Sequence, residues 1–444
     1  MQNQGSHLTL AATGDALITR RFSMYKEDQF LGLIDLLRKV DVAFTNLEML
    51  FHTYEEGFPA LESGGTYMAA DPVIAEDLKW AGFNLFATAN NHTYDYADGG
   101  MLSTMAVLDK LGLVYAGTGR NLLEARGPAY LDTPQGRVAL ISMASTFPAA
   151  AQAGEQRPDM KGRPGLNPLR FEERYAISQE TMEKLKQLSE TLGLEEAKRQ
   201  RMAIGFERPP EDPNVFEFLK HKFVVGEKPE IRTTVHKGDA EGNLRWIRDA
   251  RRQADWVLVS LHSHESEVRD KEVSAEFIPP FARSCIDAGA DAFIGHGPHL
   301  LRGIEIYNKK PIFYSLGNFV FQNETVTRLP SDIYEKFRLD PYKSTPADVF
   351  DARALDEKGE LKGFPADSRY WESVVATCTF KGRDLSVLDL YPITLGYRQP
   401  RSVRGRPFLA DDELGHSIIQ RLAKLSEPYG TTIEFQEGRG VVRL

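Results

Sequence analysis

The chain has 444 residues, a length that fits one large domain with insertions or two modules. Hydrophobic residues make up 42%, so a substantial core can form and wholesale disorder is excluded. The 54 basic and 63 acidic residues leave a formal net charge of −9, which argues against a nucleic-acid-binding protein. Only Cys285 and Cys378 are present, and this excludes a disulfide framework or a cysteine-based zinc site.

The sequence shows no pattern typical of a membrane span or a signal peptide. No stretch approaches the roughly 18 apolar residues that cross a bilayer. Residues 1–7 lack a basic region, and the apolar run over residues 8–12 is too short for a signal peptide. We therefore expect a cytoplasmic protein without a membrane segment.

The first third of the chain alternates short apolar runs with helical patterns. In chain order, the pattern predicts a strand over 8–13, a helix over 28–40, a strand over 41–44, a helix over 72–81, a strand over 84–88, a helix over 101–111 and a strand over 137–143. Alternation of this kind predicts a mostly parallel sheet with helical crossovers, that is, an α/β protein.

The alternation stops over residues 147–239, where prolines interrupt the chain around a charged helix over 178–192. We interpret this segment as a lid-like insertion with little core of its own. The pattern then resumes with a helix over 244–254, a strand over 256–261, a helix over 277–288, a strand over 292–294, a hairpin over 303–307 and 311–314, and antiparallel strands over 374–380 and 385–390. The predicted organisation is a core of 1–146 and 240–324, the insertion, and a C-terminal extension over 325–444 that packs on the core.

Polar residues gather where the predicted strands end. They are Asp15, Glu48, the run Asn90-Asn91-His92, the pair His262 and His264, and the pair His296 and His299. In open α/β sheets the carboxyl ends of the strands face one crevice, so these residues become neighbours. Carboxylates, an amide oxygen and imidazoles are ligands for a divalent metal such as manganese, zinc or iron.

Each of these residues also has a plainer interpretation. Asp15 alone fits a turn residue, an Asn pair fits left-handed turn positions, and a lone strand-end histidine fits a satisfied core residue. The run Gly295–His299 is harder to explain in this way, because its Gly-Pro turn lets both histidines face one site. The joint occurrence at five successive strand ends favours the metal site.

Together these motifs resemble the bacterial CapA family, which is associated with poly-γ-glutamate capsule synthesis and is similar to calcineurin-like metallophosphoesterases. The matching motifs are Gly14-Asp15, Asn46-Leu47-Glu48, Asn90-Asn91-His92 followed by Asp95-Tyr96, Gly295-His296-Gly297-Pro298-His299, and Tyr314-Ser315-Leu316-Gly317-Asn318-Phe319. The resemblance covers residues 8–146 and 240–322. It implies a four-layer α/β/β/α sandwich with one or two metal ions at the strand ends.

The resemblance also implies roles for individual residues. The implied metal ligands are Asp15, Glu48, Asn91, His262, His296 and His299. His92 would donate a proton or contact the substrate, and Asn318 would support the site. Of the His262 and His264 pair, His262 at the strand end is the preferred ligand, which leaves His264 to face the substrate.

Two features depart from the family pattern. Metallophosphoesterases usually begin with Asp-x-His, whereas the third position here is Leu17, so one metal ligand is missing. Capsule-synthesis members are commonly anchored to a membrane, and no anchor is expected here. With only Asp15 and Glu48 carrying charge, one ion would leave the cluster near neutral, whereas two ions with a hydroxide would leave it positive.

The sequence leaves three functions open. We favour a metal-dependent hydrolase whose substrate is anionic, either a phosphoester or a γ-glutamyl or other peptide bond, with Arg163 and Arg170 of the insertion as an anion clamp. The second is a metal-dependent peptide epimerase, similar to those of lasso-peptide maturation, with Asp15 and His296 as the acid–base pair. The third is a non-catalytic scaffold that binds a polymer.

Overall fold

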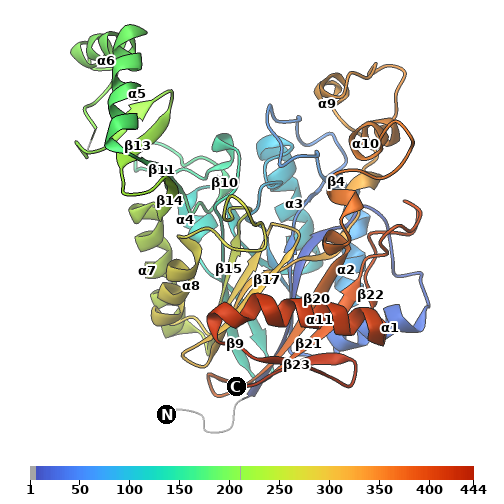
Figure 1. The fold of residues 1–444 in the computed structure, drawn as a ribbon. Helices are drawn as coiled ribbons and strands as arrows, with labels where there is room; N and C mark the ends of the chain where they lie inside the picture. Colours follow the sequence, from blue (N-terminus) through green and yellow to red (C-terminus); the bar gives the residue numbers. More distant parts are fainter. Residues whose placement is uncertain (1–6, 211) are drawn as a thin grey trace.

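The computed structural model describes residues 7–210 and 212–444. Residues 1–6, on which part of the expectation about a signal peptide rests, lie outside the described part. Two large β-sheets stand face to face in the body of the molecule, with helices on both outer sides (Figure 1). None of the helices in the described part of the chain is long and apolar enough to cross a membrane.

The first sheet is built around β1 (His7–Leu17). Its parallel part consists of β2 (Val42–Leu47), β5 (Leu85–Ala87), β6 (Val114–Ala116) and β19 (Asn318–Phe321). On the other side of β1 the sheet continues antiparallel through β20 (Glu372–Lys381), β21 (Asp384–Thr394), β22 (Phe408–Leu409), β24 (Arg439–Val442) and β23 (Ile433–Gln436). The strands from the C-terminal third therefore complete the same sheet that begins at residue 7.

The second sheet has six strands in the order β17-β18-β16-β15-β9-β8. They are β17 (Leu301–Tyr307), β18 (Lys310–Leu316), β16 (Ala292–His296), β15 (Trp256–His262), β9 (Gly136–Ala144) and β8 (Ala129–Thr133). The four central strands are parallel, and β17 and β8 pair antiparallel at the two edges. Buried, nearly continuous apolar runs such as β15 are typical of parallel strands covered on both faces.

The alternation of side chains along the strands produces three apolar layers. Leu10 of β1 and Leu258 of β15 share the cluster between the two sheets. Their neighbours Ala11 and Val257 point the other way, into the two outer clusters. The outer layers contain α1 (Asp28–Arg38), α2 (Ala75–Ala81) and α3 (Ala97–Leu111) on one side, and α7 (Lys237–Gln253) and α8 (Ile278–Asp287) on the other. The predicted four-layer α/β/β/α architecture is confirmed.

Every strand and helix expected in the two sheets and their crossovers occurs, with shifted ends. The largest shift is in α7, which begins at Lys237 rather than at Leu244. Its first turn is polar, and the side chain of His236 accepts a hydrogen bond from the backbone of Asp239 at 3.2 Å, which caps the helix. Elements that the apolar pattern did not predict include β6, β8 and β19, which are five residues long at most.

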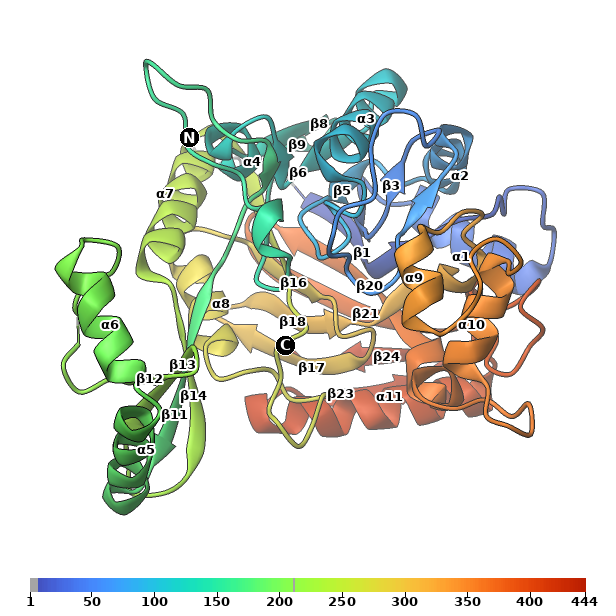
Figure 2. The ribbon, with the colours of Figure 1, turned by 90° about the horizontal axis from the view of Figure 1, so that it is seen from above.

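Within the insertion, residues 171–235 form a separate arm. Its sheet consists of β11 (Phe171–Ile177), β12 (Phe216–Phe218), β13 (His221–Val225) and β14 (Glu230–Val235), and it carries α5 (Gln179–Thr191) and α6 (Leu194–Ala203). Few of its apolar side chains are buried, among them Ala176 and Met182. The arm rises on one side of the molecule, opposite α9 (Ser331–Lys336) and α10 (Pro346–Ala354) (Figures 1 and 2).

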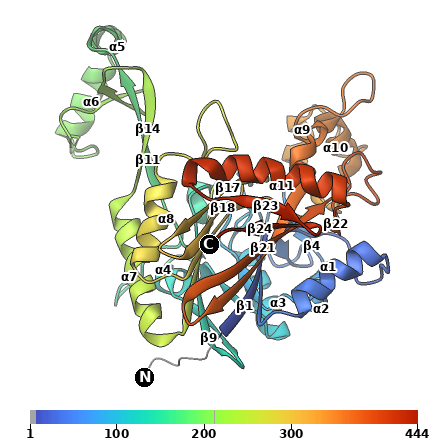
Figure 3. The same ribbon diagram turned by 60° about the horizontal axis from the view of Figure 1, so that its bottom comes forward.

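The C-terminal helix α11 (Asp412–Ser426), also absent from the sequence expectations, lies across the edges of both sheets (Figure 3). Its Ile418, Ile419 and Leu422 are buried in the cluster between the sheets. Further short strands and helices are β3 (Leu50–Phe51), β4 (Ala69–Ala70), β7 (Thr118–Gly119), α4 (Leu122–Arg126) and β10 (Gly165–Leu166), and Asn323–Thr325 form a 3₁₀ turn.

Candidate metal centre

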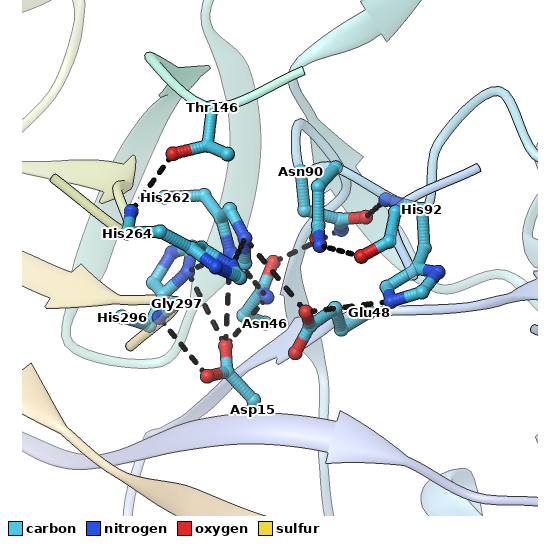
Figure 4. A network of polar contacts seen from close by, with 12 residues as sticks. Asp15, Asn46, Glu48, Asn90, His92, Thr146, His262, His264, His296 and Gly297 are labelled. Atoms are coloured by element: carbon cyan, nitrogen blue, oxygen red, sulfur yellow. Dashed lines mark hydrogen bonds and ion pairs between the residues drawn. The ribbon is translucent and has the colours of Figure 1, made fainter. Parts of the chain in front are cut away.

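The carboxyl ends of the parallel strands bring the polar residues of both sheets to one place (Figure 4). Strand register places Asp15 beside Asn46 and Asn318 in the first sheet, and His262 beside His296 in the second. The crowding of β1 against the turn before β19 requires Gly14, because a Cβ at this position would lie 1.8 Å from the carbonyl oxygen of Gly317. This close approach lets the backbone of Asp15 donate to the same oxygen at 2.9 Å.

Asp15 is fully buried at the centre of the cluster. Its Oδ1 accepts a hydrogen bond from Asn46 Nδ2 at 2.8 Å, and its Oδ2 accepts one from the backbone of Gly297 at 3.0 Å. Its oxygens also lie 3.5 Å from the Nδ1 atoms of His296 and His299. Burial alone would raise the pKa of this carboxyl, but His299 and His296 lower it below its ordinary value, so Asp15 is a carboxylate.

Three of the histidines form a chain of close nitrogen contacts. His262 Nδ1 lies 3.1 Å from His296 Nδ1, and His262 Nε2 lies 3.1 Å from His264 Nε2. On its far side, His296 Nε2 contacts Ser260 Oγ at 2.6 Å. Burial lowers the pKa of His264 to about 3 and that of His296 to about 4, and it lowers the pKa of His262 well below the ordinary value. Neutral imidazoles keep a nitrogen lone pair for a metal ion.

Glu48 is fully buried like Asp15, but neither of its carboxylate oxygens has a hydrogen-bond partner among the described residues. Oε1 lies 3.7 Å from His262 Nε2, 3.8 Å from His299 Nε2 and 3.9 Å from His92 Nε2. Burial and the nearby charges of Asp15 and Asp95 raise the pKa of Glu48 well above its ordinary value. An orphaned carboxylate surrounded by imidazoles is the geometry of a cation site.

His92 is oriented by a second carboxylate. Its Nδ1 lies 2.7 Å from Asp95 Oδ2, so the proton is on Nδ1 and Nε2 faces Glu48. Asp95 is held in turn by the backbone amides of Gly64 and Met68, at 2.9 and 2.7 Å. The neighbouring Asn91 donates to the carbonyl of Gly64 at 3.0 Å, and its buried Oδ1 has no hydrogen-bond partner in the part of the chain that the structure describes.

His299 is placed by its turn and by Asn318. Its backbone has a φ of 59°, a left-handed conformation that follows the Gly297-Pro298 pair. Asn318 Oδ1 accepts a hydrogen bond from His299 Nδ1 at 2.8 Å. The structure therefore brings together eight of the residues singled out in the sequence: Asp15, Glu48, His92, His262, His264, His296, His299 and Asn318.

The residues present fit a divalent metal. Two ligand atoms, each about 2.1 Å from one ion, are at most about 4.2 Å apart. This condition is met by every pair among three ligand atoms. Asp15 Oδ1 lies 3.8 Å from His262 Nδ1 and 3.5 Å from His296 Nδ1, and the two Nδ1 atoms are 3.1 Å apart. Glu48 forms further groups of the same kind with His262 and His264, and with Asp15 and His299. Carboxylate and imidazole donors in overlapping groups suit one or two ions of manganese, zinc or iron.

Beside the cluster is a cavity of about 430 Å³. His92, His264 and His299 line it on the cluster side, and Leu17 supplies apolar surface at the position where the sequence lacks a further histidine. The remaining walls come from several separate segments of the chain. Their residues are Gly64, Gly65, Thr66, Ser266, Lys271, Pro298, Phe321, Asn323, Arg353, Phe364 and Tyr370. Sequence reasoning missed Lys271, Asn323 and Arg353, because none of them is part of a local motif.

The arginines of the insertion are placed elsewhere. Arg170 forms a two-point ion pair with Asp239, with contacts of 2.7 and 2.8 Å. Arg163 donates to the backbone oxygen of Gln152 at 2.9 Å. Neither residue lines the cavity beside the cluster, so this geometry does not support the anion clamp that the sequence suggested for them.

Comparison with known proteins gives a consistent family. A family model described as bacterial capsule synthesis protein PGA_cap matches residues 9–323. The chain is 36% identical over 441 residues to the uncharacterized protein y4sH of Sinorhizobium fredii, across 98% of this chain and 93% of that protein. It is 25% identical over 326 residues to the capsule biosynthesis protein CapA of Bacillus anthracis, across 72% of this chain and 61% of that protein.

Two facing sheets between helical layers, with carboxylates and imidazoles at the strand ends, define a protein of the metallophosphoesterase-like fold. Within that class, the chain belongs to the bacterial capsule synthesis protein family PGA_cap. The resemblance to CapA proteins seen in the sequence is thereby confirmed.

Proposed function

We propose that this protein is a metal-dependent hydrolase whose ligands are Asp15, Glu48, Asn91, His262, His296 and His299. The observation that carries the proposal is Glu48, a fully buried carboxylate without a hydrogen-bond donor among the described residues. Leaving such a charge unpaired costs several kcal/mol, and a bound cation would give it the partner that it lacks. A divalent ion in such a site supplies Lewis acidity and makes water a nucleophile near neutral pH.

The residues at the cavity have distinct tasks in hydrolysis. His92 is held by Asp95 and lies at the border between the cluster and the cavity, where its Nε2 would take up the proton that the attacking water releases and pass it to the leaving group. Asn318 fixes the ring of His299. His264 lines the cavity and contacts the substrate from the side of the second sheet.

The geometry favours hydrolysis over epimerisation. An epimerase needs two free bases on opposite sides of one α-carbon. Asp15 Oδ1 lies only 3.5 Å from His296 Nδ1, so the two residues do not flank a substrate carbon. Both oxygens of Asp15 also already accept hydrogen bonds. Neither residue lines the cavity, whereas His92 does.

The substrate that we propose is anionic and belongs to capsule or peptide metabolism. The names of two relatives refer to capsule biosynthesis and to PGA biosynthesis. The second is a Bacillus subtilis CapA that is 34% identical over 158 residues, 32% of this chain and 40% of that protein. A phosphoester or a γ-glutamyl peptide bond fits that context. A non-catalytic scaffold that binds polymer would not require buried, unpartnered metal ligands.

The reaction type can be tested in deuterated water. The purified protein is incubated with γ-glutamyl peptides and with phosphomonoesters, and the products are analysed by mass and chirality. We expect smaller products without deuterium at the α-carbon. An intact substrate that gains one deuterium at an inverted centre would establish the epimerase instead, and binding without any chemistry would support the scaffold.

A further inference from the structure

The cavity wall away from the metal ligands carries two cationic side chains. Arg353 comes from α10 in the C-terminal extension, and Lys271 comes from the loop between β15 and α8. Arg353 donates to Thr66 Oγ1 at 2.9 Å and lies 5.0 Å above the ring of Phe364. Within residues 7–210 and 212–444, no carboxylate lies within ion-pair distance of Arg353 or Lys271.

The absence of a carboxylate partner among the described residues distinguishes Arg353 from the neighbouring arginines. Glu324, the acidic residue whose charge reaches Arg353, is in direct contact with Arg401 at 3.1 Å and with Arg404. Burial lowers the pKa of Arg353, and the charge of Glu324 opposes this only in part. The half-buried guanidinium therefore retains donors that protein groups do not satisfy.

Asn323 gives an independent sign of a ligand at the same wall. It is 6% exposed, it lines the cavity, and its Oδ1 has no hydrogen-bond partner among the described residues. A buried acceptor without a donor costs about 1–3 kcal/mol, so a ligand N–H is the expected partner. A carboxamide both donates and accepts, and this matches the two polar groups of an amide bond.

We infer that Arg353, Lys271 and Asn323 form a subsite for an amide-containing substrate that carries a free carboxylate, as a peptide does. Arg353 and Lys271 bind the carboxylate, and Asn323 hydrogen-bonds to the amide, while the cluster holds the bond to be cleaved. The arginine fork matches a carboxylate at two points. This inference rests on the proposed hydrolase function and assigns its substrate class.

In the test, titration calorimetry measures the binding of three probes to the purified protein. N-acetyl-L-glutamate presents an amide and carboxylates, glutarate presents carboxylates alone, and inorganic phosphate represents the phosphoester alternative. The variants are Arg353→Met, Arg353→Lys, Lys271→Met and Asn323→Leu. Lys358→Met, an exposed lysine of the same extension, is the matched control. Metal content is measured for every variant.

We expect N-acetyl-L-glutamate to bind more tightly than glutarate, and Asn323→Leu to remove that difference. Arg353→Met should weaken both carboxylate probes by about ten-fold or more, with Lys358→Met unchanged. Lys271→Met changes an exposed side chain, so it should weaken binding without affecting the fold. The metal content should stay constant throughout.

Unchanged binding in both Arg353→Met and Lys271→Met overturns the subsite. Tighter binding of phosphate than of N-acetyl-L-glutamate, lost in Arg353→Met, overturns the carboxylate assignment in favour of a phosphoester. The proposed hydrolase function fails by a different result, namely wild-type protein that takes up no metal, so the two failures are distinguishable.

Discussion

Two buried carboxylates in this molecule have opposite surroundings. Asp239, at the start of α7, accepts hydrogen bonds from the backbone and guanidinium of Arg170 and from Arg126, and these outweigh burial and lower its pKa. Glu48, at the strand ends, accepts no hydrogen bond from residues 7–210 or 212–444, and burial raises its pKa. The comparison shows that burial of a charge does not itself mark a functional site, and that a buried charge without a partner among the described residues is the stronger candidate.

The same contrast separates the arginines. Arg170 donates two hydrogen bonds to Asp239 and so stabilises the junction of the arm with α7, although the sequence suggested that it binds substrate. Arg353 has no carboxylate partner among the described residues and faces the cavity. The density of positive charge in the sequence does not show which charges are already paired, so by itself it does not locate a substrate-binding arginine.

The largest effect is expected from removing two imidazoles of the cluster. His296→Ala together with His299→Ala should sharply lower the metal content of the purified protein, because two of the three groups of ligands lose a member. Elemental mass spectrometry measures this content. The matched control is His221→Ala with His416→Ala, which removes two exposed histidines. An equal fall in the control would show that the loss is not specific to the cluster.

The next effect concerns catalysis with the metal retained. His92→Ala should lower kcat by about 10²–10⁴-fold, because proton transfer to the leaving group is lost. Asp95→Asn should lower it less, by about 10–100-fold, because His92 stays but its tautomer is no longer fixed. Steady-state kinetics on the identified substrate test whether kcat falls further in His92→Ala than in Asp95→Asn. An Asp95→Asn enzyme with unchanged kcat would contradict the role assigned to the pair.

A smaller effect, on stability alone, is expected at the paired carboxylate. Asp239→Asn should lower the free energy of unfolding by about 2 kcal/mol, because charged hydrogen bonds to Arg170 and Arg126 are lost. The pKa of Asp239 lies below its ordinary value of 3.8, so this contribution is fully present above that pH and lost as the pH falls through the lowered pKa. Denaturant unfolding at pH 7 and pH 3 should show a smaller difference at pH 3. Loss of metal in this variant would contradict a purely structural role.

The smallest effect is expected at the insertion loop. Arg163→Gln should leave the binding of N-acetyl-L-glutamate and the metal content unchanged, because Arg163 contacts the backbone of Gln152 and does not line the cavity. Calorimetry alongside Arg353→Met makes the comparison direct. If Arg163→Gln weakened the binding of N-acetyl-L-glutamate and Arg353→Met did not, the insertion loop would bind the anion and the prediction would be wrong.

Much of the fold and the cluster could be predicted from the sequence for a physical reason. Buried parallel strands require continuous apolar runs, and polar residues directly after such runs must lie at one edge of a sheet. Asp15, His262 and His296 were found in this way. The short strand β19 escaped detection, because its place depends on the close approach of Gly14 to Gly317 rather than on its own composition.

The cavity wall could not be predicted in the same manner. Arg353 meets Thr66 across a separation of 287 residues, so its position follows from how α10 packs and not from neighbouring residues. Asn323 belongs to a short 3₁₀ turn with no distinctive pattern. Residues of this kind become visible only when the packing of distant segments is known.

The central claim is that Glu48, Asp15 and the imidazoles hold a metal ion. The most direct measurement is the metal content of wild-type protein purified without chelator and then equilibrated with manganese or zinc, followed by elemental mass spectrometry. The account predicts between one and two equivalents per chain, in line with the overlapping ligand groups. Wild-type protein that remains metal-free after this treatment would contradict it.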